Sequence, residues 1–529
     1  MKVHFTGRTP RLGDPDSRRD RSAGIPPIPA QILDRHRARV LRPGEAVLAP
    51  GESTPGSTIY RYDRVMLCHK LLGSSERLAE LDAAIALQGV RVERDDHNNG
   101  DRVPRRFQRA RLTIGDRATP VSVDAWKTVQ NLRASVHGGR CDADLAGRVR
   151  LEHILVGSAI GGPGSLIGQG DEFWPRGTGP YSGPLSYPGR VPVDLMVPMP
   201  PRRPVDALPG KRRPVVAVLD TGIAHEHPDL DVSEEQEGED TFVVVNSGLQ
   251  KLLTDNADND SPVLKGAWDQ PHTEGSLLGD LTSHFGHGTF MTGILRQLAP
   301  DCQVRSYRVT HNDGLTYENE LLIALDHIAD EAERAWDGDD TVNPVDIVVL
   351  AMGYPDEHPE DSPKGGLASM VNRLANLGIA VVAAAGNYST TRPFYPAAMA
   401  AVDREPTAAP VLSVGALNPN GSVAMFSNDG PWVTCFALGA SMVSTFPVFE
   451  GSLNPDRESR ARRRFRESLD PDDFSSGYAI WSGTSFAAPV VAAKLAAALT
   501  TEDVTAGVSV TDARSSAYRL QAAVKAIGG

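Results

Sequence analysis

The chain has 529 residues, 40% of them hydrophobic, which is enough to bury more than one core and to divide into domains. Charged residues make up 23% and aromatic residues 6%, which excludes a wholly disordered, fibrous or membrane-embedded protein. The formal net charge of -13 argues against nucleic acid as a partner, because phosphate binding requires a basic face.

Four cysteines lie far apart in the chain and form no C-x-x-C pair: Cys68, Cys141, Cys302 and Cys435. This pattern is typical of buried small residues rather than of a disulfide framework. The opening segment MKVHFTGRTPRLGDPDSRRD lacks the apolar stretch of a signal peptide, and no run approaches the ~18 apolar residues that span a bilayer. The sequence therefore predicts a cytoplasmic protein without a membrane partner.

Two regions precede the largest part of the chain. Residues 1–57 are rich in Arg and Pro and show little periodicity, which predicts a partly disordered leader. Residues 58–157 alternate strand and helix patterns instead. The expected strands are 58–68, 90–95, 106–115 and 148–157, and the expected helices are 74–89 and 122–138. The order β-α-β-β-α-β predicts a small α+β domain of ferredoxin-like topology.

The remaining chain is expected to form a linker and an α/β domain. Residues 158–212 are rich in Gly and Pro, which predicts the linker. Over residues 213–529, short apolar runs alternate with amphipathic helical patterns. The expected strands are 215–219, 304–309, 346–352, 378–386 and 410–417. This alternation predicts a mostly parallel sheet covered by helices on both faces, with functional groups at the carboxyl ends of its strands.

Two polar residues stand where such a fold places its chemistry. Asp220 ends the apolar run RPVVAVLD, so its carboxylate could accept a hydrogen bond from a histidine and fix the histidine tautomer. His287 precedes the apolar stripe of a helix, whose N-terminus does not stabilise a cationic imidazole and so favours a neutral base. Taken singly, Asp220 could equally cap a turn, and His287 could be a loop histidine like His284.

Two further residues complete a pattern with this pair. Ser485 opens the Ala-rich helix in WSGTSFAAPVVAAKLAAAL, where free backbone N–H groups can stabilise an oxyanion. Asn387 follows the buried run VVAAAG, so its side-chain amide could donate to the same charge. Alone, Ser485 could be a helix cap and Asn387 a turn residue. In the chain order Asp, His, Asn, Ser, the four together indicate hydrolysis by an activated serine.

Four segments resemble the Asp, His, Asn and Ser boxes of the subtilase family of serine proteases (peptidase family S8): VAVLDTGIAHEHPDL (216–230), FGHGTFMTGIL (285–295), VVAAAGN (381–387) and GTSFAAP (483–489). The resemblance implies a subtilisin-like three-layer fold and a serine endopeptidase that forms an acyl-enzyme intermediate. In this interpretation Ser485 is the nucleophile, His287 the general base and Asp220 the residue that orients the base. Asn387 is then the oxyanion donor beside the backbone N–H of Ser485.

The resemblance also implies that an extended substrate strand lies between two segments of the chain. The residues expected to bind it are Ala351, Met352, Gly353, Ala384 and Gly386. A substrate that adds a strand suits an enzyme that cleaves flexible chains, so the expected partner is a protein or peptide substrate. Tyr354 stands where many subtilases keep a small residue and could narrow the primary specificity pocket.

Two insertions depart from compact subtilases. The acidic insertion between Asp220 and His287 contains TDNADNDSP (254–262), which could hold structural Ca²⁺ but lacks EF-hand spacing and is better explained as a solvated loop. No cofactor is expected for catalysis, and no metal ligand is assigned. The second insertion, 454–477, is densely charged. It could be a substrate-facing loop or a self-cleavage site, but a mobile surface excursion is the better explanation.

The N-terminal region leads to two hypotheses. Subtilases often carry a ferredoxin-like pro-domain that assists folding and occupies the active site, and the order expected for 58–157 resembles it. This region is therefore interpreted as an inhibitory or folding domain. Alternatively, residues 1–157 recognise a regulatory protein partner. A third interpretation, a catalytically degenerate binding or sensor protein, would require the loss of a triad residue, and all three are present.

Overall fold

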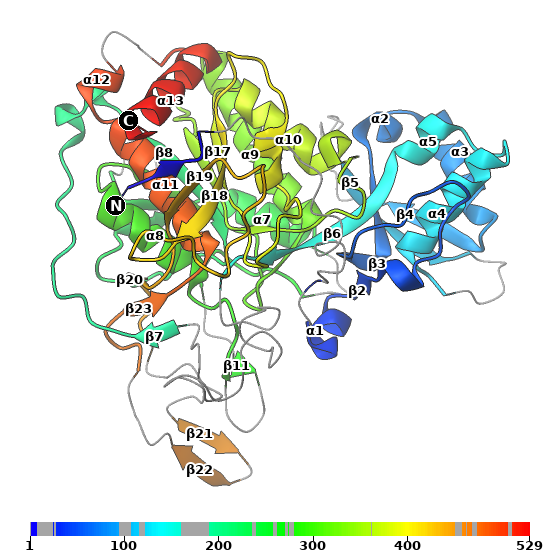
Figure 1. The fold of residues 1–529 in the computed structure, drawn as a ribbon, viewed down its shortest axis with the longest axis horizontal. Coiled ribbons are helices and arrows are strands. Elements are labelled where there is room, and N and C mark those ends of the chain that lie inside the picture. The colour runs from blue at the N-terminus through cyan, green and yellow to red at the C-terminus, as the bar shows by residue number, and fades with distance from the viewer. Residues whose placement is uncertain are drawn as a thin grey trace.

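The computed structural model shows a large α/β domain and a smaller α+β domain side by side (Figure 1). It describes residues 2–528 except 8–24, 26–27, 95–106, 116–121, 160–189, 235–239, 258–261, 270–272, 275–279, 361, 450–457, 462, 468–472 and 506–509.

The larger domain is built on a nine-stranded sheet in which only the edge strand β1 runs antiparallel to its neighbour. Its spatial order is β1 (His4–Phe5), β19 (Cys435–Leu438), β18 (Val411–Leu417), β17 (Ala380–Ala384), β15 (Ile347–Leu350), β8 (Val215–Asp220), β13 (Gln303–Arg308), β10 (Val243–Val245) and β9 (Val232–Glu234). The central strands β8, β15 and β17 are buried along their whole length, as a parallel sheet covered on both faces requires. The mostly parallel sheet expected from the apolar runs is confirmed.

Helices cover both faces of this sheet. One core contains residues of α8 (His287–Leu298), α11 (Thr484–Ala498) and α13 (Ala513–Gly528), and the other contains residues of α7 (Ser247–Asp255), α9 (Glu318–Trp336) and α10 (Gly366–Asn376). Strand β8 supplies both cores, because Val216 and Val218 belong to the first and Val215, Ala217 and Leu219 to the second. The result is the three-layer arrangement that the resemblance implied.

The larger domain also contains smaller elements. Three short sheets pair β20 (Met442–Thr445), β23 (Tyr478–Trp481) and β7 (Arg190–Pro192); β11 (Thr273–Glu274) and β12 (Asp280–Leu281); and β21 (Glu458–Ala461) and β22 (Arg464–Glu467). A short helix, α12 (Glu502–Thr505), precedes α13. The last of these sheets is a hairpin within the charged insertion 454–477. It projects away from both domains in Figure 1.

The smaller domain is an antiparallel sheet with helices packed on it. Its strands β3 (Thr58–Leu67), β4 (Val90–Arg94), β5 (Gln108–Ile114) and β6 (Val149–Gly157) lie in the order β6-β3-β5-β4, and its helices are α2 (His69–Leu72), α3 (Ser75–Ala86), α4 (Ala125–His137) and α5 (Ala143–Gly147). Ser74 and Asp124 cap α3 and α4 through their side chains. The expected β-α-β-β-α-β topology is thereby confirmed.

The described part of residues 1–57 packs on both domains. Strand β1 pairs with β19, and β2 (Ala38–Leu41) pairs with β3. Between them, α1 (Ala30–Arg35) places Ile32 in a buried cluster with Leu315 and Tyr317 of the larger domain. This segment therefore joins the two domains.

Strand β6 is shared between the domains. Its first half lies in the smaller sheet, and its second half pairs with β14 (Leu315–Tyr317) on one side and with β16 (Met352–Gly353) on the other. A buried ion pair between Arg109 of β5 and Glu320 of α9, 2.9 Å apart, adds to this junction. In Figure 1 the strand extends from the smaller domain into the larger one.

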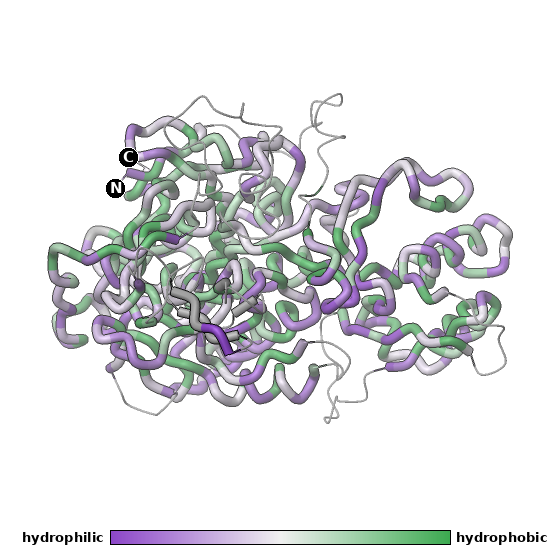
Figure 2. Tube along the Cα trace, turned by 90° about the horizontal axis from the view of Figure 1, so that it is seen from below, coloured by the Kyte–Doolittle hydropathy of each residue, from purple (hydrophilic) through white to green (hydrophobic). Residues whose placement is uncertain are grey.

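In Figure 2, hydrophobic segments run through the middle of the larger domain, where the sheet and its covering helices lie. None of the helices in the described residues combines the length and the apolar character needed to cross a membrane.

Candidate active site

Asp220 and His287 meet at the carboxyl edge of the central sheet. Asp220 is the last residue of β8, and His287 is the first residue of α8. The Nδ1 atom of His287 lies 2.7 Å from Oδ1 of Asp220, which also accepts the backbone N–H of Thr221 at 2.8 Å. Nε2 of His287 has no hydrogen-bond partner among the described residues. The carboxylate can thus hold the ring by one nitrogen and leave the other to act as a base.

Ser485 is the second residue of α11 and follows the turn at Gly483. Its hydroxyl donates to the backbone oxygen of Ala351 at 3.2 Å, so in this rotamer it is not hydrogen-bonded to His287. The ring of the next residue, Phe486, lies 5.2 Å from the His287 ring, measured between centroids. The segment that carries Ser485 therefore contacts His287 through Phe486, and the Ser485 hydroxyl would have to leave Ala351 before it could give a proton to Nε2 of His287.

Asn387 is held with its amide nitrogen uncommitted. Its Oδ1 atom accepts the backbone N–H of Thr484 at 3.0 Å and the Thr484 hydroxyl at 2.9 Å. The Nδ2 atom is buried and has no hydrogen-bond partner among the residues that the structure describes. A donor fixed in this way beside the N-terminus of α11 is suited to a developing negative charge.

The end of β6 lies against residues 351–353 and Ser485, in the space between them that we call the groove. Gly157 pairs with Met352 and Val156 with Gly353, so the segment expected to bind a substrate strand binds a strand of the same chain. The backbone N–H of Ser158 donates to Ala351 at 2.8 Å, and the Ser158 carbonyl oxygen accepts the Ser485 N–H at 3.1 Å. The sequence did not single out Ser158, because this contact joins residues more than 300 positions apart.

Two buried charged residues support the site and were also missed. The guanidinium of Arg190 donates to the backbone oxygens of Thr282 and Phe285 at 2.9 and 2.5 Å, and burial lowers its pKa to about 9. Asp269 accepts the Thr221 hydroxyl at 3.2 Å, and burial raises the pKa of its carboxyl to about 7. Arg190 lies in the segment interpreted as a linker and Asp269 in an insertion, so no motif marked either one.

Comparison with known proteins agrees with this architecture. The family model described as "Subtilase family" matches residues 211–523, which is more than half of the chain. The chain belongs to the subtilase family. Its sequence relatives include the thermophilic serine proteinase of Bacillus sp. (strain AK1), 26% identical over 297 residues that are 54% of this chain and 52% of that protein. Thermitase of Thermoactinomyces vulgaris is 26% identical over 277 residues, 52% of this chain and 71% of that protein.

The similarity to these proteins is partial. This subtilase spans about half the length of the first relatives, the Bacillus proteinase and a subtilisin of Bacillus sp. (strain TA39). A solved lanthipeptide protease matches 54% of this chain and 73% of its own, at 19% identity and a TM-score of 0.35. The distant relatives named in these comparisons are serine proteases.

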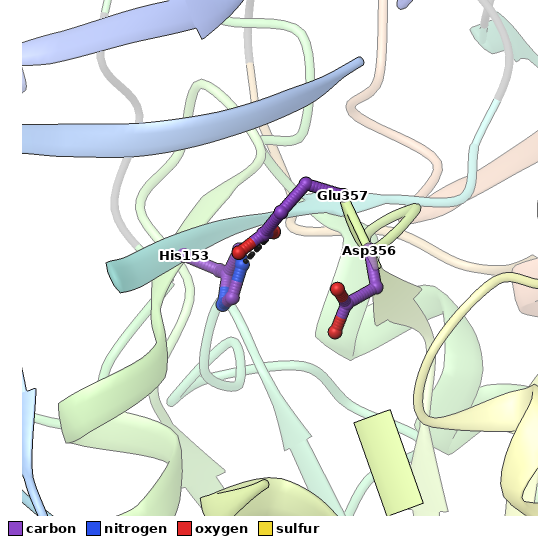
Figure 3. Close-up of side chains that lie close together, drawn as sticks. All are labelled: His153, Asp356 and Glu357. Atoms are coloured by element: carbon purple, nitrogen blue, oxygen red, sulfur yellow. Dashed lines mark hydrogen bonds and ion pairs between the residues drawn. The ribbon is translucent and has the colours of Figure 1, made fainter. Parts of the chain in front are cut away.

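One cluster of His and acidic side chains lies where the N-terminal domain meets the subtilase domain (Figure 3). His153 of β6 lies 3.0 Å from Glu318 through Nδ1 and 2.8 Å from Glu357 through Nε2. Asp356 completes the group, and one atom of each of His153, Asp356 and Glu357 lies within 4.8 Å of the others, as a metal ion would require. Each of the three already has a partner within the protein, however. His153 and Glu357 bind each other, and Asp356 accepts the Ser362 hydroxyl at 2.5 Å. The cluster is therefore explained as an ion-pair network.

The expected calcium segment contributes no assigned ligand. Its residues 254–257 include the end of α7, and 258–261 lie outside the described residues. Structural calcium accordingly stays a prediction.

We expect the docking of the N-terminal domain to depend on pH through this ion-pair network. Burial by itself lowers the pKa of His153, but the carboxylates of Glu357 and Glu318 outweigh it and raise this pKa well above 6.5. The charged ring thus stabilises the docked domain fully below pH 6.5, and this contribution is lost as the pH rises through the raised pKa. We expect His153→Gln to cost about 3 kcal/mol near pH 6 and progressively less at alkaline pH.

Thermal unfolding of both proteins between pH 6 and 10 measures this difference. Groups remote from His153 are common to the two proteins and cancel. Burial raises the pKa of Asp356 to about 7 against the charge of His153, so the response of Asp356 to the substitution is part of the measured difference. The exposed His137 provides the matched control, His137→Gln, which should show no such trend. A His153→Gln deficit that stays constant or grows with pH would contradict the expectation.

Proposed function

We propose that this subtilase is a serine endopeptidase whose first substrate is the Ser158–Ala159 bond of its own chain. The observation that carries the proposal is the position of the Ser158 carbonyl, whose oxygen accepts the N–H of Ser485 at 3.1 Å while β6 lies in register in the groove. Membership of the subtilase family and the serine proteases among the relatives support the reaction type.

The proposed reaction uses four residues in successive steps. Ser485 rotates away from Ala351, gives its proton to Nε2 of His287 and attacks the Ser158 carbonyl carbon. Asp220 holds the resulting imidazolium through Nδ1. The carbonyl oxygen becomes an oxyanion that accepts the Ser485 N–H and the Nδ2 amide of Asn387.

The intermediate then collapses. The bond between the Ser158 carbon and the Ala159 nitrogen breaks, and His287 returns the proton to that nitrogen, which leaves as a new amino terminus. Ser158 is now an ester of Ser485. A water molecule gives a proton to His287, attacks the ester and releases Ser158 as a carboxylate, while Ser485 regains its proton.

The N-terminal domain is proposed to act as the inhibitor of the enzyme it precedes. In the intact chain β6 pairs with β14 and β16 and Leu155 is buried in the subtilase core, and none of these contacts involves the bond that is cut. The cut strand would therefore block other protein or peptide substrates until residues 1–158 dissociate. A regulatory partner that binds this domain could trigger the release. The hypothesis that residues 1–157 recognise a regulatory protein is therefore compatible with inhibition by the same domain.

A fluorophosphonate probe tests the proposed function on the full chain. We expect the purified protein to be cut between Ser158 and Ala159 and then to react at one serine, which peptide mapping should assign to Ser485. Ser485→Ala is the unlabelled control. Labelling of another residue, or equal labelling of the control, would overturn the assignment. An intact chain that never reacts would favour the degenerate binding protein instead.

A further inference from the structure

Near the proposed nucleophile, the groove has room only for small side chains of the bound strand. If the proposed function holds, we infer that the enzyme selects flexible segments with glycine two residues before the cleaved bond and a small residue directly before it. Two aromatic side chains, His284 and Phe394, would impose this choice. The reasons lie in the contacts of β6 and in the walls of the groove.

His284 fills the space beside Gly157, the second residue before the Ser158–Ala159 bond. A Cβ atom added to Gly157 would lie 2.6 Å from Nε2 and 2.7 Å from Cδ2 of His284, far inside van der Waals contact. Any side chain at this substrate position would therefore have to displace the imidazole. Glycine is the residue that fits the observed groove.

The His284 ring has little room to move. Nδ1 lies 2.9 Å from the Ser283 hydroxyl, and the ring packs 5.2 Å from the His287 ring between centroids. Gly314, at φ +84°, closes the opposite edge, because a Cβ there would lie 2.2 Å from His284 Nδ1. The side chain is 3% exposed, and burial holds its pKa near 3, so it is a neutral wall of the groove. His284 thus acts as a fixed block rather than as a flexible side chain.

Phe394 fills the neighbouring space, between the two segments expected to flank the substrate. A Cβ added to Gly353 would lie 2.5 Å from Cε1 of Phe394, and one added to Gly386 would lie 2.9 Å from its Cδ1. The ring is 1% exposed and therefore cannot swing into solvent. Ser158, the residue after β6, has a small side chain and binds Ala351, two residues before Gly353, through its backbone.

Tyr354, which the sequence suggested as a residue that could narrow the primary specificity pocket, contacts an earlier part of β6. Its ring stacks on His153 of β6, with centroids 4.2 Å apart. Its backbone pairs with Tyr395, the residue after Phe394. These contacts do not test whether Tyr354 narrows the primary specificity pocket, so that suggestion stays a prediction.

At the end of the groove away from the cleaved bond, we expect the enzyme to select an apolar substrate side chain. Leu155, four residues before the Ala159 junction, is fully buried in the same cluster as Tyr354 and Leu350. Val156 belongs to the cluster built by Leu315 and Ile28. The bound sequence Leu-Val-Gly-Ser-Ala thus combines aliphatic anchors with a glycine and small residues at the bond. A glycine next to a small polar residue is typical of flexible linkers, which can adopt the extended form that the groove requires.

A pair of substitutions in the full chain tests the inference. Gly157→Ala should slow cleavage at Ser158–Ala159 by about 10- to 100-fold, because the added methyl group meets His284. In the His284→Ala background the same substitution should cost less than about 3-fold. Rates are followed by intact mass, and Gly147→Ala is the matched control, because a Cβ atom added there would meet no atom within 4 Å.

The same rates distinguish the ways in which the inference could fail. Equal cleavage of the Gly157→Ala and unmodified chains, or an equal loss in the His284→Ala background, would overturn it. If either variant fails to fold, the self-cleaved protein from which residues 1–158 have dissociated is given the peptides Leu-Val-Gly-Ser-Ala and Leu-Val-Ala-Ser-Ala, and indiscriminate cleavage overturns the inference. Cleavage of neither, without labelling at Ser485, would overturn the proposed function instead.

Discussion

Ser485→Ala is expected to lower the rate of cleavage at Ser158–Ala159 by about 10⁶-fold, so that the full chain accumulates intact. The substitution removes the oxygen that forms the ester with Ser158. It leaves the N–H of residue 485 in place, so the Ser158 carbonyl should still be bound at 3.1 Å. Binding of β6 and chemical cleavage are therefore separated, and only the chemistry should be lost. Intact mass measured over days of incubation gives the rate.

Ser482→Ala is the matched control for this loss. Ser482 lies three residues earlier, outside α11, and its hydroxyl accepts the backbone N–H of Ser441 at 2.9 Å. We expect that variant to cleave itself within about 3-fold of the unmodified rate. If Ser485→Ala were cleaved at the same bond as fast as Ser482→Ala, another nucleophile or a contaminating protease would be responsible.

The fold could be predicted largely because its signals are local. A parallel strand covered on both faces is a short apolar run, and VVAVL and IVVL lie within β8 and β15 as expected. In the smaller domain, Ser74 and Asp124 mark where α3 and α4 begin, because their side chains cap these helices. The ends of these elements differ from the expected ranges by a few residues, since the last turns and edge positions depend on packing.

The candidate site was predictable where a residue ends a strand or begins a helix. Asp220 and His287 do so, and the structure brings them to 2.7 Å of each other. Ser158, His284 and Phe394 carry no such local mark. Their importance follows from β6 entering the groove, which depends on contacts between residues hundreds of positions apart. The linker interpretation of 158–212 stays a prediction, since 160–189 lie outside the described residues, and its Gly and Pro content did not mark Ser158 as a contact of Ser485.

Asp220→Asn should keep the fold and lower the rate of self-cleavage by about 10⁴-fold. In the structure one oxygen, Oδ1, accepts both the Thr221 N–H and the proton on His287 Nδ1. An asparagine can present its N–H₂ group to Nδ1, which would then become the acceptor nitrogen and place the ring proton on Nε2. That tautomer cannot take the proton of Ser485, and the Thr221 N–H would lose its acceptor as well. Asp231→Asn, at an exposed position of the same loop region, should cleave itself at the unmodified rate. A loss smaller than 10-fold for Asp220→Asn, measured by intact mass beside that control, would mean that the carboxylate does not set the tautomer of His287, and that the base is oriented by other contacts.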